Sequence, residues 1–194
     1  MNANDIWLIA GLGNPEAKYE GTRHNAGFAA LDSLAGKWGI SVSKTKFQGL
    51  WGQGEVDGHK VVLLKPLTYM NLSGDCVAAA MQWYKVQPQD VMIFSDDIDL
   101  ELGTLRVRPF GGSGTHNGWR DILLKTGSDR FPRIRIGVGA RPTFWNLADW
   151  VLSRYQTEEE RKAMDACFAR AAEAAECFVL HGIDKAMNTY NTKA

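Results

Sequence analysis

Two residues of this 194-residue chain, His24 and Asp96, could perform acid–base chemistry together. His24 stands at the expected start of a helix, where the helix N-terminus disfavours the imidazolium and keeps the ring able to accept a proton. Asp96 follows the apolar run 91–94, and an aspartate can hold a histidine in one tautomer and stabilise its charged form. A lone histidine is more often structural, so this hypothesis requires that the two side chains touch.

Three asparagines occupy comparable places in the chain. Asn14 follows the apolar run 6–10, Asn71 follows the strand expected to end near Lys65, and Asn117 precedes a helix. An asparagine offers both a donor and an acceptor, which suits a peptide backbone or a ribose edge. Capping of the next helix is the alternative for Asn71. Because loops leave the carboxyl ends of parallel strands at one edge, these residues are expected to meet there with His24 and Asp96.

The carboxylate-rich segment 95–101 supports a different hypothesis. Hard cations such as Mg²⁺ prefer carboxylate oxygens, so this segment with His24 and His116 could form a metal-dependent phosphoesterase site. Nucleotide-binding motifs are incomplete: Glu16 stands where the third glycine of a dinucleotide fingerprint belongs. The glycine loop 111–118 lacks the Gly-Lys-Ser/Thr ending of a P-loop, although its glycines allow close approach of a ligand.

Composition is that of an ordinary globular protein, with 45% hydrophobic and 23% charged residues and a net charge of zero. Residues 104–154 nevertheless contain nine Lys/Arg against three Asp. This excess permits a basic face for phosphates, although arginines paired elsewhere would explain it equally well. The three cysteines do not cluster, and no signal-peptide layout or membrane-length apolar run is present, so we expect a cytoplasmic protein without membrane contact.

Apolar periodicity and turn residues predict an α/β fold, built as a single domain over residues 1–194, with a twisted mixed β-sheet and helices on both faces. Asp57-Gly58 predicts a hairpin turn, Gly39 a helix C-terminus, and Thr157 with Glu160 a capping box at the start of a long helix that ends before Gly182. The expected strands are 6–10, 50–56, 60–64, 91–94, 104–107 and 133–138, and the other expected helices are 28–38, 74–84 and 119–125.

Taken together, these segments resemble the bacterial peptidyl-tRNA hydrolase family over about 180 residues. Each motif is weak alone, but their order and spacing make the resemblance specific. The matching segments are residues 11–15, Tyr19, 22–27, 65–66, 70–74, 96–100, Gly114, 116–118, 133–139, 149–153 and 186–188.

The resemblance implies a cofactor-free, metal-free and usually monomeric hydrolase that cuts the ester between a peptide and the 3′ end of tRNA, freeing the tRNA for translation. By position, His24 is implied as the base and Asp96 as the residue that stabilises it. Asn14 is implied to distinguish peptidyl-tRNA from aminoacyl-tRNA. No serine has a nucleophile-elbow setting, so we expect direct attack by water. The implied substrate-binding residues are Tyr19, Tyr69, Met70, Asn71, His116 and Asn117, and the implied tRNA-phosphate contacts are Arg108 and Arg135.

The sequence departs from the family pattern at several positions without losing a proposed catalytic group. Ser95 stands where histidine is frequent, and Trp119 stands where leucine is usual. These changes concern substrate preference and the mobility of loops, including a possible lid at residues 141–154. Two alternatives stay open, namely the metal-dependent phosphoesterase and a non-catalytic tRNA-binding protein on the same scaffold. The other departures are Glu16, Phe110, Thr115 and the pair Glu101-Leu102.

Overall fold

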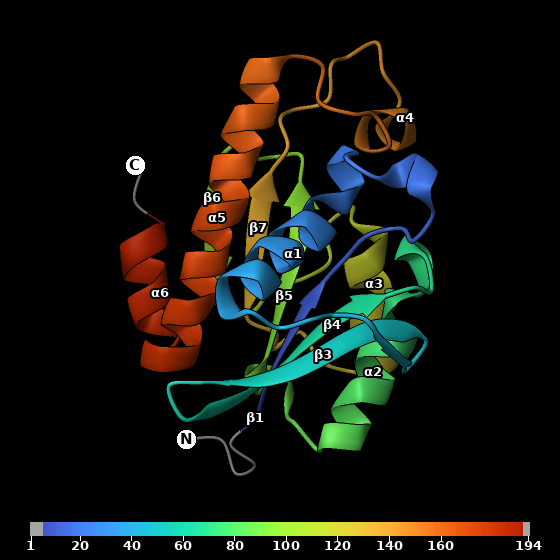
Figure 1. Cartoon of the computed structure of the whole chain (residues 1–194). Coiled ribbons are helices and arrows are strands. Elements are labelled where there is room, and N and C mark those ends of the chain that lie inside the picture. Colours follow the sequence, from blue (N-terminus) through green and yellow to red (C-terminus); the bar gives the residue numbers. More distant parts are fainter. Residues whose placement is uncertain (1–5, 192–194) are drawn as a thin grey trace.

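A computed structural model describes residues 6–191, in which seven strands form one mixed sheet (Figure 1). The strand order is β2-β3-β4-β1-β5-β7-β6. The four central strands, β4, β1, β5 and β7, run parallel, and the outer pairings are antiparallel. The strands are β1 Ile6–Gly11, β2 Lys44–Lys46, β3 Gly49–Val56, β4 His59–Pro66, β5 Val91–Asp97, β6 Leu105–Arg108 and β7 Arg133–Gly137.

Helices cover both faces of the sheet, as predicted (Figure 1). Helices α1, α5 and α6 pack on one face, and α2 and α3 pack on the other. The short α4 lies apart, above the start of α1 (Figure 1). Among residues 6–191, no helix combines the length and apolarity needed to cross a membrane. The helices are α1 Ala26–Trp38, α2 Ser73–Tyr84, α3 Asn117–Thr126, α4 Leu147–Val151, α5 Glu158–His181 and α6 Ile183–Tyr190, and the 3₁₀ helices are η1 Ala17–Tyr19, η2 Arg23–Asn25, η3 Met70–Leu72 and η4 Pro88–Asp90.

The central strands are buried on both sides, which explains their continuous apolar sequences. Ile9 of β1 faces the core beneath α1 and α5, whereas its neighbour Leu8 faces the core beneath α2 and α3. Phe94 and Ile93 of β5 divide in the same way. A strand that is buried on both sides has no polar face, so its sequence shows no alternation of apolar and polar residues.

Local signals in the sequence are confirmed at three turns and caps. Asp57 and Gly58 both have positive φ, 47° and 83°, in the two-residue turn between β3 and β4. Gly39 ends α1 in the left-handed conformation with φ 64°. Thr157 and Glu160 form the expected capping box at the start of α5.

One strand and two α-helices were not predicted. The three-residue β2 is largely exposed, contains two lysines and pairs only with β3, so it has no apolar alternation to detect. Helix α4 has five residues, which is too short for a helical period. Helix α6 begins directly after Gly182, which sequence reasoning treats as the end of helical structure.

Close backbone contact brings the first helix onto the sheet. A Cβ atom at Gly27 would lie 2.5 Å from the backbone of Leu12 and of Phe94, so only glycine permits this packing. A Cβ atom at Gly11 would likewise lie 2.3 Å from the Gly27 carbonyl oxygen. The start of α1 and the 3₁₀ turn before it are thereby placed at the carboxyl end of β5, beside Asp96.

Candidate active site

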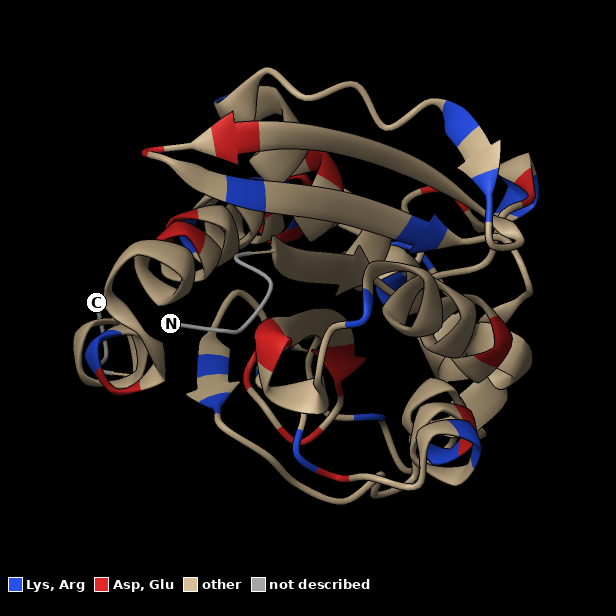
Figure 2. Cartoon of the chain, turned by 90° about the horizontal axis from the view of Figure 1, so that it is seen from below, with Lys and Arg blue, Asp and Glu red and all other residues tan. Residues whose placement is uncertain are grey.

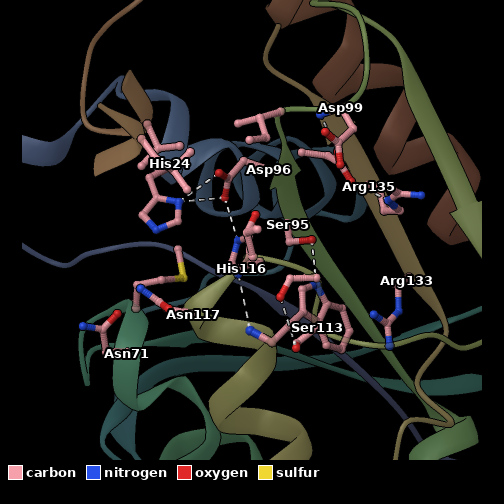
Figure 3. Close-up of a pocket in the computed structure, with 18 of the residues that line it drawn as sticks. His24, Asn71, Ser95, Asp96, Asp99, Ser113, His116, Asn117, Arg133 and Arg135 are labelled. Atoms are coloured by element: carbon pink, nitrogen blue, oxygen red, sulfur yellow. Dashed lines mark hydrogen bonds and ion pairs between the residues drawn. The ribbon is translucent and has the colours of Figure 1, made fainter. Parts of the chain in front are cut away.

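His24 and Asp96 are in contact at the carboxyl edge of the sheet, and a second histidine joins them (Figure 3). His24 Nδ1 lies 3.0 and 2.9 Å from the two carboxylate oxygens of Asp96. His116 Nε2 lies 2.9 Å from Oδ1 of the same carboxylate. The Asp96 side chain is only 3% exposed, so its charge is compensated mainly by these two rings.

The two histidines use opposite ring nitrogens. His116 caps α3 by accepting the backbone N–H of Trp119 at Nδ1, over 3.3 Å. The neutral His116 ring must therefore have its proton on Nε2, from which it donates to Asp96. His24 donates its Nδ1 proton to Asp96, which leaves the lone pair on Nε2. Of the two rings that contact Asp96, only that of His24 has a nitrogen without a partner among the described residues, and this nitrogen can accept a proton from a ligand.

The electrostatics of the pair favour the charged states. Burial lowers the pKa of His24, but the charge of Asp96 and the hydrogen bond to it raise the pKa further, so the net pKa lies above the ordinary 6.5. Burial raises the pKa of Asp96, and its interactions with His24 and His116 outweigh this and hold that pKa well below its usual range. Asp96 therefore stays a carboxylate and stabilises a protonated His24.

The same three side chains bring possible metal-ligand atoms within 4.8 Å of one another. A metal ion binds a histidine nitrogen through its lone pair. The lone pair of His116 is used at Nδ1 by Trp119, and its Nε2 carries a proton. The arrangement therefore fits a hydrogen-bonded relay better than a metal site. The carboxylates of residues 97–101 do not join this group, and Asp97 is paired with Arg135.

Hydrogen bonds hold Asn14 through both its backbone and its side chain. Its N–H donates to Asn25 Oδ1 at 2.8 Å, and Asn25 Nδ2 donates back to the Asn14 carbonyl oxygen at 3.0 Å. The Asn14 side-chain oxygen accepts the Met70 N–H at 2.8 Å. This contact determines which way the amide points, so the Asn14 NH₂ group is the part left to donate to a ligand. Asn25 is a positioning residue that sequence reasoning did not single out, although it directly follows His24.

A cavity of about 910 Å³ joins these groups. All the residues predicted for the site border this cavity, although they come from widely separated segments of the chain. Apolar residues of α4 line one side of it. The glycine loop after β6 forms another wall. The predicted residues that border the cavity are Asn14, Tyr19, His24, Tyr69, Met70, Asn71, Asp96, Arg108, His116, Asn117 and Arg135.

The basic stretch 104–154 is partly neutralised by ion pairs. Lys125 lies between Asp75 and Asp121, at 2.7 and 3.1 Å, and Arg135 is paired with Asp97. Figure 2 shows Lys and Arg spread over several elements rather than gathered on one face. Arg108 is exposed at the border of the cavity. Among the described residues, ion pairing therefore accounts for Lys125, Arg130 and Arg135, but not for the other six basic residues of this stretch.

Comparison with known proteins agrees with this geometry. A profile described as peptidyl-tRNA hydrolase matches residues 8–194 of the chain.

The chain belongs to the peptidyl-tRNA hydrolase family.

Curated members of this peptidyl-tRNA hydrolase family align along almost the whole chain, which is therefore a hydrolase. The peptidyl-tRNA hydrolase of Lachnospira eligens is 48% identical over 186 residues, covering 96% of this chain and all of the relative. That of Alkaliphilus oremlandii is 49% identical, covering 95% and 98%. The crystal structure of the Acinetobacter baumannii enzyme superposes with a TM-score of 0.92 at 37% identity, covering 99% of this chain and 97% of that one.

Proposed function

We propose that the chain hydrolyses the ester between a peptide and the 3′ end of tRNA, with His24 as the general base. The observation that carries this proposal is the hydrogen bond from His24 Nδ1 to Asp96, which leaves Nε2 as the proton acceptor in the cavity. General-base catalysis contributes roughly 10²–10⁴-fold. An ester is already activated, so neither a metal nor a covalent intermediate is needed.

The reaction then proceeds in two steps. His24 Nε2 takes a proton from a water molecule while the water oxygen attacks the ester carbonyl, and the carbonyl π electrons move onto oxygen. The tetrahedral intermediate collapses, the bond to the ribose 3′ oxygen breaks, and that oxygen takes the proton from the His24 imidazolium. Asp96 stabilises the imidazolium between these steps. In this proposal, amide donors that border the cavity, such as Asn71 and Asn117, stabilise the oxyanion.

Asn14 supplies the selection for a peptide in this proposal. Its oriented NH₂ group would donate to the carbonyl of the peptide bond that precedes the ester. Aminoacyl-tRNA lacks that carbonyl and leaves the donor unpaired, which costs binding free energy. Tyr19, Tyr69 and Met70 border the same cavity and would contact the peptide and the terminal nucleotide.

We place the tRNA 5′ phosphate at Arg108 and Arg135. Arg108 is exposed, and Arg135 is partly neutralised by Asp97, so Arg108 should contribute more to the salt dependence of binding. Arg108→Ala should weaken binding of peptidyl-tRNA and reduce the slope of affinity against salt by about one unit. A peptidyl-nucleotide without a 5′ phosphate should bind almost as before. Equal loss with both substrates would contradict the phosphate assignment.

We also propose that residues 1–194 act as one cytoplasmic catalytic domain and as a monomer. All groups of the proposed site lie on one chain around one cavity, which makes a partner subunit unnecessary. Activity per mole that is independent of protein concentration, with a monomeric mass by light scattering, is the expected result. Activity that disappears on dilution would contradict it.

The central experiment compares N-acetylaminoacyl-tRNA, peptidyl-tRNA and aminoacyl-tRNA as substrates for the wild type and for Asn14→Ala. The wild type should release peptide and prefer the N-blocked substrates, and excess EDTA should leave cleavage intact. Asn14→Ala should lose both rate and preference. An inactive wild type would overturn the proposed function, and activity that EDTA abolishes and Mn²⁺ restores would favour the phosphoesterase alternative. Mg²⁺ also shapes tRNA, so the short peptidyl-nucleotide serves as the control substrate.

A further inference from the structure

Two departures from the family pattern, Ser95 and Trp119, form a hydrogen bond with each other. The Trp119 indole N–H donates to Ser95 Oγ at 2.9 Å, and both side chains are buried. Ser95 directly precedes Asp96 on β5. Trp119 is therefore attached twice to the site: by its indole beside Asp96, and by its backbone N–H to His116.

A buried arginine continues this contact to the glycine loop. The Arg133 guanidinium lies 3.5 Å from the centre of the Trp119 ring and is only 4% exposed. It donates to the carbonyl oxygens of Gly112 and Gly111 at 2.9 and 2.6 Å, and to that of Phe131 at 3.3 Å. Within residues 6–191 it forms no ion pair. A buried cation that binds only carbonyl oxygens stabilises the backbone that presents them.

The loop held in this way is part of the cavity wall. Residues 111–115 border the cavity and connect β6, which ends at Arg108, to His116. The His116 N–H donates to the Ser113 carbonyl oxygen, and the Gly111 N–H donates to that of Asp129, both at 3.1 Å. Glycines lose much conformational entropy on ordering, so this loop needs contacts from outside to keep one shape.

We propose that Trp119 and Arg133 are positioning residues that hold residues 111–114 of the glycine loop against α3 and β5, and so set the width of the cavity for the 3′ end of the substrate. The effect on substrate binding rests on the proposed function, whereas the anchoring of the loop does not. Arg133 is suited to this role because a planar guanidinium can stack on an indole and bind several carbonyls at once, which a lysine ammonium cannot reproduce.

Hydrogen exchange measures the anchoring without substrate. Trp119→Phe keeps an aromatic face for Arg133 but loses the hydrogen bond to Ser95. Arg133→Lys keeps the positive charge but loses the planar guanidinium that binds several carbonyl oxygens at once. Both variants should speed exchange of the Gly111 and His116 amides by about tenfold or more, because these bonds open more often. Trp83→Phe, at an exposed tryptophan of α2, and Arg106→Gln, on β6, are the matched controls and should leave both amides unchanged.

Kinetics with peptidyl-tRNA then measure the consequence. We expect KM to rise about tenfold in Trp119→Phe and Arg133→Lys while kcat stays within about threefold, since His24 and Asp96 are untouched. Unchanged exchange at Gly111 together with an unchanged KM would overturn the proposal. Slow activity of the wild type itself would count against the proposed function, whereas the exchange result would still decide the anchoring.

A double-mutant cycle serves where Arg133→Lys does not fold. Ser95→Ala removes the acceptor of the hydrogen bond between Trp119 and Ser95, and Trp119→Phe removes its donor. Both changes therefore break the same hydrogen bond. The double variant should be no worse in KM or in exchange than the worse single variant. Independent, additive effects would show that Ser95 and Trp119 do not act as one link.

Discussion

Two segments bring a histidine to Asp96, and they differ in what the rest of each ring does. The 3₁₀ turn η2 presents His24 through Nδ1, and the N-terminus of α3 presents His116 through Nε2. His116 is tied at both nitrogens, because Nδ1 also caps its helix. His24 is tied at one nitrogen only. Equal distance to a carboxylate therefore does not give two histidines equal roles: the second contact of each ring decides which one can exchange a proton.

The largest effect that follows from this asymmetry belongs to His24. His24→Ala should lower kcat on peptidyl-tRNA by roughly 10²–10⁴-fold with tRNA affinity near normal, because the base acts in the transition state. Single-turnover rates and a binding assay on the same variant measure the two quantities. Near-normal turnover would shift the role of base to His116 and reverse the comparison.

Loss of the shared carboxylate should have the next largest effect. Asp96→Asn should slow turnover by roughly 10- to 10²-fold, the value of a hydrogen bond to a charged group of about 1.5–3 kcal/mol. Combined with His24→Ala it should add little, because the two residues act as a unit. A double variant that loses the product of both effects would mean that Asp96 acts independently of His24.

The pH dependence of kcat/KM separates the two segments by sign. A base must be neutral, so the wild-type rate should rise with pH through a pKa above 6.5. In Asp96→Asn, burial still lowers the pKa of His24, but the carboxylate that raised it is gone, so this pKa should fall. His116→Asn removes a donor from Asp96 and strengthens its hold on protonated His24, so the pKa should rise. Shifts in the same direction for both variants would contradict the proposed relay.

The smallest effect is expected at His116 itself. His116→Asn keeps a side-chain acceptor for the Trp119 N–H, so turnover should stay within about threefold of the wild type. His116→Ala lacks that cap and should lower the free energy of unfolding by about 1 kcal/mol, measured by denaturant unfolding. Equal stability of the Asn and Ala variants would remove the capping role on which the comparison depends.

Much of the fold was predictable because its signals are local. The hairpin turn at Asp57-Gly58 and the capping box at Thr157 each lie within four residues, so a short stretch of chain specifies them. Apolar periodicity and turn residues correctly indicated the α/β architecture, and every predicted site residue borders the cavity. Helix α4 and strand β2 were missed because such short elements are stabilised by neighbours rather than by their own periodicity.

By itself, the sequence determined the types of most elements, the family and most of the polar residues at the sheet edge. Only the tertiary structure decided how they act. His24 and Asp96 are 72 positions apart, and the Asn14 amide is oriented by Met70, 56 positions away. Tautomers, amide orientation and the pairing of Arg135 with Asp97 depend on which atoms meet in space. Sequence spacing does not contain those contacts, because they arise from long-range packing of separate loops rather than from local conformational preference.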